Sequence, residues 1–274
     1  MGYEVRIEEI AYCRHPSGEL LARLYLPQGP GPFPGVVEVH GGAWILNDRL
    51  TNRDIHQPLA ESGVAVMAID FRMPPVAQYP ASIADINLAL RWLKRNARDF
   101  KVDPARVGGL GTSSGGHQLM LATLRPDDPR FNALPLAGGE AIDARPAFVV
   151  LCWSILDPLA RYRMAVAKGI DRLVKAHNAY WPSEEAMAEG NPQLILERNE
   201  AQHRPRALLL QGTNDDNVTP DMAERFLATY RARGGAIELE IFPGEPHAFV
   251  AKDPATASSR RAVERIIGFV HQKG

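Results

Sequence analysis

Residues 106–120 read RVGGLGTSSGGHQLM, and this stretch decides the fold class. It holds a Gly-x-Ser-x-Gly pattern with Ser113 at its centre. An apolar run that begins at Val107 predicts a strand before the pattern, and residues 117–124 predict a helix after it. Between a strand and a helix, a turn this tight holds a serine hydroxyl exposed above a sheet. Gly and Ser are also ordinary loop residues, so the rest of the chain must supply a base, an orienting acid and an oxyanion site.

The composition fits one large α/β domain spanning residues 1–274. The chain is 45% apolar. Its net charge of −1 does not indicate binding to nucleic acid or to an anionic membrane. Neither the number nor the spacing of Cys13 and Cys152 indicates a disulfide framework or a zinc site. We see no secretory signal and no apolar stretch long enough to span a membrane. We therefore expect a cytoplasmic protein without cofactor or metal, and leave a homodimer open.

Strands and helices alternate along most of the chain. Strands are expected at 7–12, 20–26, 35–40, 64–70, from Val107, and at 148–153, 206–211 and 237–242, the first two as a hairpin. Helices are expected at 53–62, 80–100, 117–124, 221–233 and 255–272. This order predicts a mostly parallel eight-stranded sheet with helices on both faces. Glu38 lies inside a predicted buried strand, where a carboxylate needs a partner or contact with water.

Residues 154–205 interrupt this alternation of strands and helices. They have helical character and no predicted strand, and Ser183 is placed to N-cap the helix that follows it. The segment is too long for an ordinary helical crossover. We interpret it as a small cap, inserted after the sixth strand and folding over the carboxyl edge of the sheet.

Four predicted strand ends carry residues suited to nucleophilic catalysis, at 40–43, 113, 211–215 and 243–247. In open α/β sheets, ligands bind at the carboxyl ends of the strands. A serine needs a base to accept its proton, and an imidazole needs a carboxylate to fix its tautomer. Ser113, Asp215 and His247 have the chain order expected for this arrangement on an α/β sheet. Asp216 is a rival for the acid.

Three other histidines are weighed against His247 as the base. His117 is expected to pack on its helix, His203 to lie at the surface, and His40 to support the loop that follows it. The oxyanion site needs backbone N–H groups. Ser114 supplies one, and the predicted donors in the upstream loop are Gly42 and Ala43, with Gly41 as the near alternative.

Aromatic residues offer a candidate substrate pocket. The candidates are Trp44, Trp153, Tyr180 and Trp181, although aromatic side chains in strands and caps are often plain core. A phosphate-binding interpretation of the glycine-rich stretch fails, because Gly-x-Gly-x-x-Gly from Gly109 needs glycine where Ser114 stands and no P-loop lysine is present. No His-Glu-x-x-His or cysteine pair indicates a metal.

Taken jointly, four motifs resemble those of α/β-hydrolase fold esterases. They are HGGAW from residue 40, GTSSGGH from 111, GTNDDNV from 212 and GEPHAF from 244, and the stretch from Tyr79 to Val107 fits as well. The resemblance is to the hormone-sensitive-lipase-related and acetylesterase-like branch, and it covers the chain from about Gly35 onward. Two departures are Thr112, where an acidic residue is frequent, and Ala43 in place of a third glycine; neither removes a backbone N–H.

The resemblance implies an α/β-hydrolase fold and a serine carboxylesterase. Family members use the residues that correspond to Ser113, Asp215 and His247, and this spacing favours Asp215 over Asp216. The expected substrate is a small aliphatic or aryl ester. An amidase, such as a formamidase or peptidase, remains possible with the same triad. A non-catalytic ligand receptor is a third interpretation, which the presence of His247 disfavours.

Overall fold

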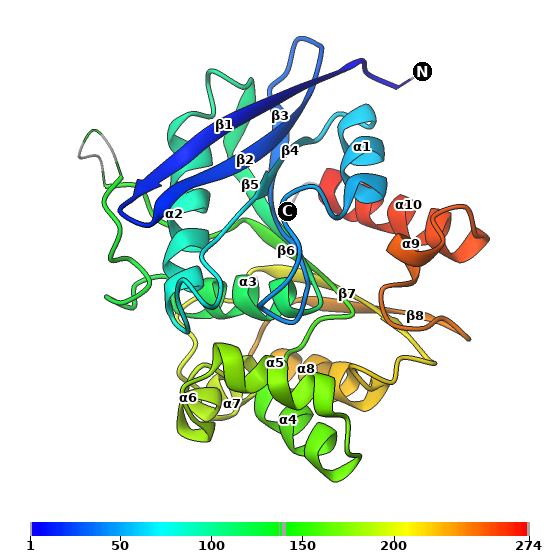
Figure 1. Cartoon of the computed structure of the whole chain (residues 1–274). Helices are drawn as coiled ribbons and strands as arrows, with labels where there is room; N and C mark the ends of the chain where they lie inside the picture. The colour runs from blue at the N-terminus through cyan, green and yellow to red at the C-terminus, as the bar shows by residue number, and fades with distance from the viewer. Residues whose placement is uncertain (1, 137, 139–140, 273–274) are drawn as a thin grey trace.

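The computed structural model describes residues 2–136, 138 and 141–272, and its strands form one eight-stranded sheet (Figure 1). The spatial order is β1-β2-β4-β3-β5-β6-β7-β8. The first two pairs, β1–β2 and β2–β4, are antiparallel and the remaining five are parallel, as predicted for a mostly parallel sheet. The bounds are β1 (Val5–His15), β2 (Gly18–Pro27), β3 (Phe33–Val39), β4 (Ala65–Ile69), β5 (Val102–Thr112), β6 (Phe148–Cys152), β7 (Arg206–Gly212) and β8 (Ile237–Phe242).

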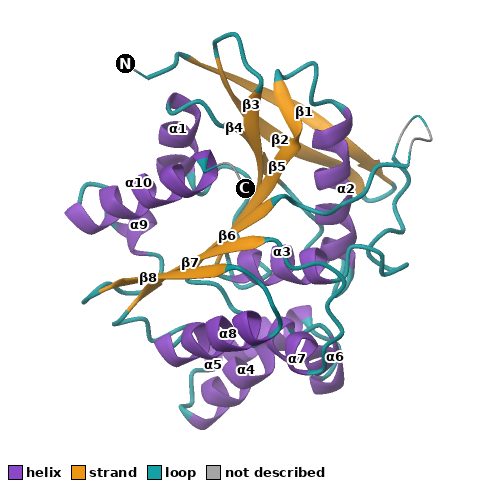
Figure 2. Ribbon diagram, turned by 180° about the vertical axis from the view of Figure 1, so that it is seen from behind, coloured by secondary structure: helices purple, strands orange, loops and turns teal. Residues whose placement is uncertain are grey.

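Helices cover both faces of the sheet (Figure 2). One face carries α1 (Arg53–Glu61), α9 (Phe249–Lys252) and α10 (Ala257–His271). The other carries α2 (Ala81–Arg95), α3 (Ser114–Leu124) and α8 (Pro220–Ala232). Each helix group buries its apolar stripe against one sheet face, so the core consists of two clusters separated by the strands. These layers confirm the predicted fold class.

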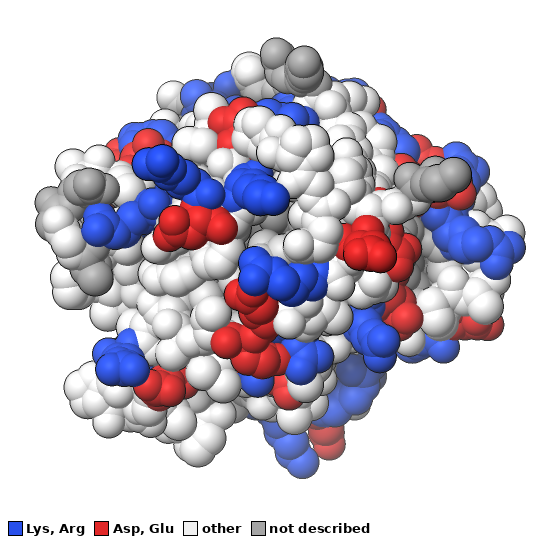
Figure 3. All heavy atoms as spheres, turned by 90° about the horizontal axis from the view of Figure 1, so that it is seen from above, with Lys and Arg blue, Asp and Glu red and all other residues white. Residues whose placement is uncertain are grey.

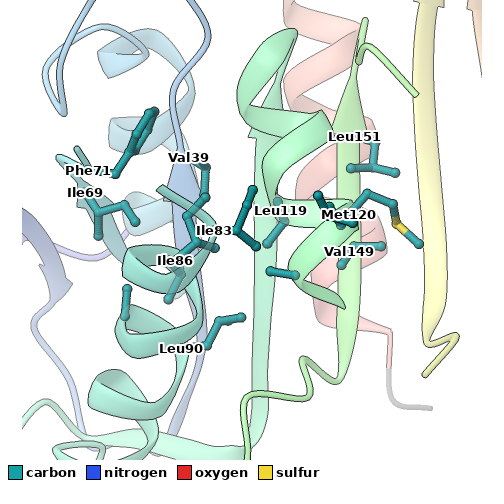
Figure 4. Packing of buried hydrophobic residues seen from close by; sticks show 14 of the residues in the cluster. Val39, Ile69, Phe71, Ile83, Ile86, Leu90, Leu119, Met120, Val149 and Leu151 are labelled. Atoms are coloured by element: carbon teal, nitrogen blue, oxygen red, sulfur yellow. The ribbon is translucent and has the colours of Figure 1, made fainter. Parts of the chain in front are cut away.

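The larger cluster explains why the helices dock where they do. In Figure 4, Ile83, Ile86 and Leu90 of α2 and Leu119 and Met120 of α3 lie beside side chains of β3, β4 and β6. The three α2 residues recur at helical spacing and are fully buried. Since α3 begins directly after Ser113, its packing on the sheet fixes the position of the turn that holds this serine.

Four helices fill the segment between β6 and β7, which was predicted to be helical and free of strands. They are α4 (Pro158–Ala167), α5 (Asp171–Tyr180), α6 (Glu184–Glu189) and α7 (Pro192–Glu197). Figures 1 and 2 both show them gathered beside α8. Ser183 accepts a hydrogen bond from Ala186 N and caps α6, as predicted, while Asp157 and Asn191 cap α4 and α7 in the same way.

Several element boundaries differ from the predicted ones. Helix α2 ends at Arg95, because Asn96 turns its side chain back to the carbonyl of Trp92 and the chain continues in turns to Phe100. Strand β5 already begins at Val102. The short helix α9 was not predicted, since four residues give no periodic pattern.

Charged side chains of both signs are interspersed over the face shown in Figure 3. This distribution agrees with the net charge of −1. Within the described ranges, no helix is long and apolar enough to cross a membrane.

Candidate active site

Ser113 occupies a strained turn between β5 and α3. Its backbone has φ 51° and ψ −118°, a left-handed conformation that costs energy for a residue with a side chain. The turn is held by hydrogen bonds from Ser113 N to Cys152 O (2.9 Å) and from Ile155 N to Ser113 O (3.1 Å). Both glycines of the pattern are sterically required. A Cβ at Gly111 would lie 2.6 Å from the Cα of Gly116, and one at Gly115 would lie 2.1 Å from the carbonyl oxygen of Val39.

We expect Gly115→Ala to destabilise the protein by about 3 kcal/mol or more, because the added methyl group meets backbone atoms that cannot rotate away. Gly268→Ala is the matched control. It adds the same methyl group on α10 where no atom lies within 4 Å, so we expect a gain of up to about 1 kcal/mol from the higher helix propensity of alanine. Urea unfolding measures both. Equal stabilities for the two variants would contradict the tight packing of the turn.

The structure brings Ser113, His247 and Asp215 into one hydrogen-bonded line. His247 Nε2 lies 2.9 Å from Ser113 Oγ, and His247 Nδ1 lies 2.8 Å from Asp215 Oδ2. A carboxylate only accepts, so Nδ1 carries the proton and Nε2 is free to accept from the serine hydroxyl. The three residues follow β5, β8 and β7, whose carboxyl ends lie at one edge of the sheet.

Asp215 is built to remain ionised. It is buried, and its Oδ1 accepts from Asn217 N (2.9 Å) and Val218 N (2.7 Å). Burial alone would raise the pKa of Asp215, but the hydrogen bond and charge of His247 and the two backbone donors outweigh it and hold that pKa below its usual value. The rival Asp216 is exposed.

The loop after β3 offers two backbone donors beside Ser113. Gly42, Ala43 and Trp44 all have positive φ (118°, 52° and 67°), so the loop curls back toward the serine. Within the described part of the chain, the N–H groups of Gly42 and Ala43 have no hydrogen-bond acceptor. Gly41 is different, since its N–H donates to Thr112 Oγ1 at 2.9 Å. We therefore remove Gly41 from the predicted oxyanion donors and keep Gly42, Ala43 and Ser114, the first residue of α3.

A buried polar network links this loop to the carboxylate of Glu38. Asn52 Nδ2 donates to Glu38 Oε1 (2.7 Å) and to Thr112 Oγ1 (3.1 Å). His56 Nε2 lies 3.0 Å from the other carboxylate oxygen of Glu38, and both side chains are fully buried. Thr112 Oγ1 thus accepts from Asn52 and from Gly41. The hydroxyl joins the strand before the nucleophile to the loop after β3.

Replacing Thr112 tests this link. Thr112→Val keeps the shape and removes the acceptor, so Gly41 loses its anchor; we expect kcat for a small ester to fall about 10- to 100-fold because the donors that follow Gly41 shift. Thr112→Ser keeps the hydroxyl and should stay within about threefold of the wild type. Steady-state kinetics give kcat and KM separately, and thermal unfolding checks the fold. If the two variants lose activity equally, the hydroxyl is not what holds the loop.

The three histidines weighed against His247 lie outside the catalytic hydrogen-bond line, and His40 and His117 have the structural roles predicted for them. His40 Nδ1 donates to Gly41 O (2.7 Å), and burial lowers its pKa. His117 accepts from Trp44 Nε1 and donates to Gly190 O, with burial lowering its pKa to about 4. His203 is half-buried and contacts Pro146 O, so it is less exposed than predicted.

A cavity of about 290 Å³ opens above Ser113. Of the predicted pocket aromatics, only Trp153 lines it. The prediction is wrong for Trp44, Tyr180 and Trp181, which are buried core: Trp44 stacks on Tyr180 at 5.4 Å and meets Trp181 edge-on. Other lining residues that the sequence did not single out include Leu46, Asn47, Arg172, Leu173 and Asn217. Arg172 and Leu173 come from α5, so the inserted helices contribute to the cavity.

Known proteins of similar sequence include esterases. Esterase LipC of Mycobacterium tuberculosis is 29% identical over 250 residues, which is 88% of this chain and 59% of that protein. A probable isoprenylcysteine alpha-carbonyl methylesterase of Oryza sativa is 23% identical over 97% of this chain and 64% of its own. The chain spans roughly three fifths of the length of the curated relatives it matches.

Solved structures of esterases share the fold. Carboxyl esterase 2 of Tuber melanosporum superposes with a TM-score of 0.80 at 22% identity, covering 98% of this chain and 87% of that one. Esterase 2 of Thermogutta terrifontis, phosphorylated by paraoxon, gives 0.76 at 21% identity over 97% and 96% of the two chains. The sequence profile described as BD-FAE matches residues 23–229. Since this match takes in most of the chain, the protein belongs to the BD-FAE family and has the α/β-hydrolase fold.

Proposed function

We propose that this chain is a serine carboxylesterase that hydrolyses small aliphatic or aryl esters through an acyl-enzyme. The observation that carries the proposal is the line of hydrogen bonds from Asp215 through His247 to Ser113, at 2.8 and 2.9 Å. A serine hydroxyl bonded to a neutral imidazole nitrogen, itself oriented by a buried carboxylate, is an activated nucleophile.

Acylation follows from this geometry. Ser113 Oγ attacks the ester carbonyl while its proton passes to His247 Nε2. Asp215 stabilises the imidazolium that forms. The negative charge on the carbonyl oxygen is held by the N–H groups of Gly42, Ala43 and Ser114, none of which is engaged elsewhere in the described chain. Each such donor typically contributes about 3 kcal/mol to lowering the barrier.

Breakdown of the intermediate uses the same groups in reverse. His247 gives its proton to the leaving alkoxide, and the alcohol departs. Water then attacks the acyl-enzyme while His247 accepts its proton. The acyl bond to Ser113 Oγ breaks, His247 returns the proton to that oxygen, and the acid is released.

The small cavity supports a short acyl or alcohol group. At about 290 Å³ it lies at the lower limit of ligand pockets, which range from ~300 to ~1,000 Å³. The Thermogutta terrifontis esterase has also been solved with propionate bound, which agrees with a small acid product. Helix α5 closes one wall of the cavity, so we assign the segment 154–205 a cap role.

An amidase is the second candidate, because the same residues can cleave an amide. A series of p-nitrophenyl esters of rising acyl length, run beside the matching p-nitroanilides, separates the two. We expect the acetate and butyrate esters to give the highest kcat/KM, with longer acyl chains falling off. Turnover of the anilides without turnover of the esters would overturn the esterase assignment.

A further inference from the structure

The wall of the cavity above Ser113 carries positive charge. Among the described residues, its wall contains no Asp or Glu side chain, and Arg172 is its only Lys or Arg. Asp171 precedes Arg172 in the chain but does not line the cavity. The catalytic carboxylate, Asp215, is fully buried beside His247 and does not line the cavity.

The guanidinium of Arg172 has no bonding partner among the described residues. The side chain is exposed, and in the described part of the chain it forms no hydrogen bond, ion pair or cation–π contact. Most other arginines of the inserted segment are engaged: Arg163 pairs with Glu184, and Arg198 donates to the carbonyl of Ala188. Arg172 is therefore free to bind a group brought by the substrate.

A second, buried cation lies nearby. Arg161 of α4 is fully buried, and its hydrogen bonds go to neutral acceptors, the backbone and side-chain oxygens of Asn217. No described carboxylate pairs with it, and its Nη1 has no partner. Burial, and next the positive charge of Arg172, lower the pKa of Arg161 to about 9, against the opposing charge of Asp215, which forms no ion pair with it. Asn217 lines the cavity, so the two guanidiniums raise the positive potential on the same wall.

A buried cation without a carboxylate partner is costly, because buried charges are normally paired. An anion in the cavity relieves this cost. A neutral ester does not, since it brings no counter-charge to either guanidinium. Electrostatic complementarity of this kind sets specificity.

From these observations we infer that the enzyme prefers esters carrying a carboxylate on the acyl or the alcohol side, with Arg172 as the residue that selects for it. The inference rests on the proposed esterase function. The preferred class includes the half-esters of short dicarboxylic acids.

The test compares charged and neutral esters of the same length. Monomethyl adipate and dimethyl adipate carry the charge difference on the acyl side, and 4-acetoxybenzoate and its methyl ester carry it on the alcohol side. Initial rates are followed by release of methanol or acetate for the wild type, Arg172→Gln and Lys175→Gln. Lys175 is the matched control, because it is an exposed cation on the same helix outside the cavity wall.

In at least one pair, we expect the wild type to favour the anionic ester by roughly three- to tenfold in kcat/KM, the range of a solvent-screened charge pair. Arg172→Gln should abolish the preference by raising the KM of the anionic ester, and Lys175→Gln should keep the preference. Raising the salt concentration should weaken it in the wild type.

Two outcomes overturn the inference, and they are distinguishable. If the neutral esters turn over normally and neither pair shows a preference that Arg172→Gln removes, the selectivity is wrong and the esterase function stands. If no ester of either pair is turned over in a Ser113-dependent way, the proposed esterase function is wrong, and the inferred selectivity is wrong as well.

Discussion

Ser113→Ala is expected to lower kcat for a small ester by on the order of 10⁴- to 10⁶-fold, because the covalent route disappears while substrate binding and the oxyanion donors remain. The fold should survive, since alanine occupies the same turn without the hydroxyl. KM should change little, because Ser113 Oγ acts on the reacting carbon and not on the remote parts of the substrate.

Ser114→Ala provides the matched control. Ser114 Oγ accepts a hydrogen bond from Trp44 N at 3.1 Å, and its proposed role in the oxyanion site is that of its backbone N–H, which alanine keeps. We expect a loss of no more than about tenfold. A loss that is equally large in the two variants would contradict the assignment of Ser113 as the nucleophile.

Asp215→Asn is expected to lower kcat by on the order of 10⁴-fold. The amide keeps the shape, and its Oδ1 can still accept from Asn217 N and Val218 N. Its NH₂ group, however, faces His247 Nδ1. That nitrogen must then accept, so the ring proton moves to Nε2, which can no longer take the proton of Ser113.

Asp216→Asn is the control for this substitution, because the two aspartates are adjacent and only Asp215 is buried. We expect Asp216→Asn to stay within about twofold of the wild type, as exposed sites usually do. Kinetics with p-nitrophenyl acetate and thermal unfolding measure both variants. If Asp216→Asn were the inactive one, the acid would have to be reassigned.

The turn around Ser113 and its hydrogen-bonded partners could be predicted because their signals are local. The glycines around Ser113 predict a tight turn. Asp215 and His247 each follow an apolar run that ends in turn residues. The structure places the three side chains within hydrogen-bond distance, and the resemblance to α/β-hydrolase fold esterases favoured Asp215 over Asp216. Because parallel strands bring their carboxyl ends to one edge of the sheet, the strand pattern implied that these three side chains lie close together.

The errors arose where contacts join distant parts of the chain. Gly41 was a reasonable donor until Thr112, 71 residues later, proved to accept its N–H. Glu38 could be recognised as needing a partner, but nothing in its own strand identifies Asn52 on the following loop or His56 on α1. Trp44 and Tyr180 were candidates for the pocket, and their stacking on each other instead depends on where α5 docks. Arg172 resembles any exposed arginine on a helix, so its position on the cavity wall had no sequence signal.

Labelling with paraoxon tests the central claim most directly, because an organophosphate reacts with a serine only when its hydroxyl is activated. Wild type, Ser113→Ala and heat-unfolded wild type are incubated with paraoxon, digested and mapped by mass spectrometry. We predict one phosphoryl adduct on folded wild type, on Ser113, with activity lost in proportion, and no adduct on the variant or the unfolded chain. An unlabelled wild type, or an adduct that persists in Ser113→Ala, would contradict a mechanism based on Ser113, His247 and Asp215.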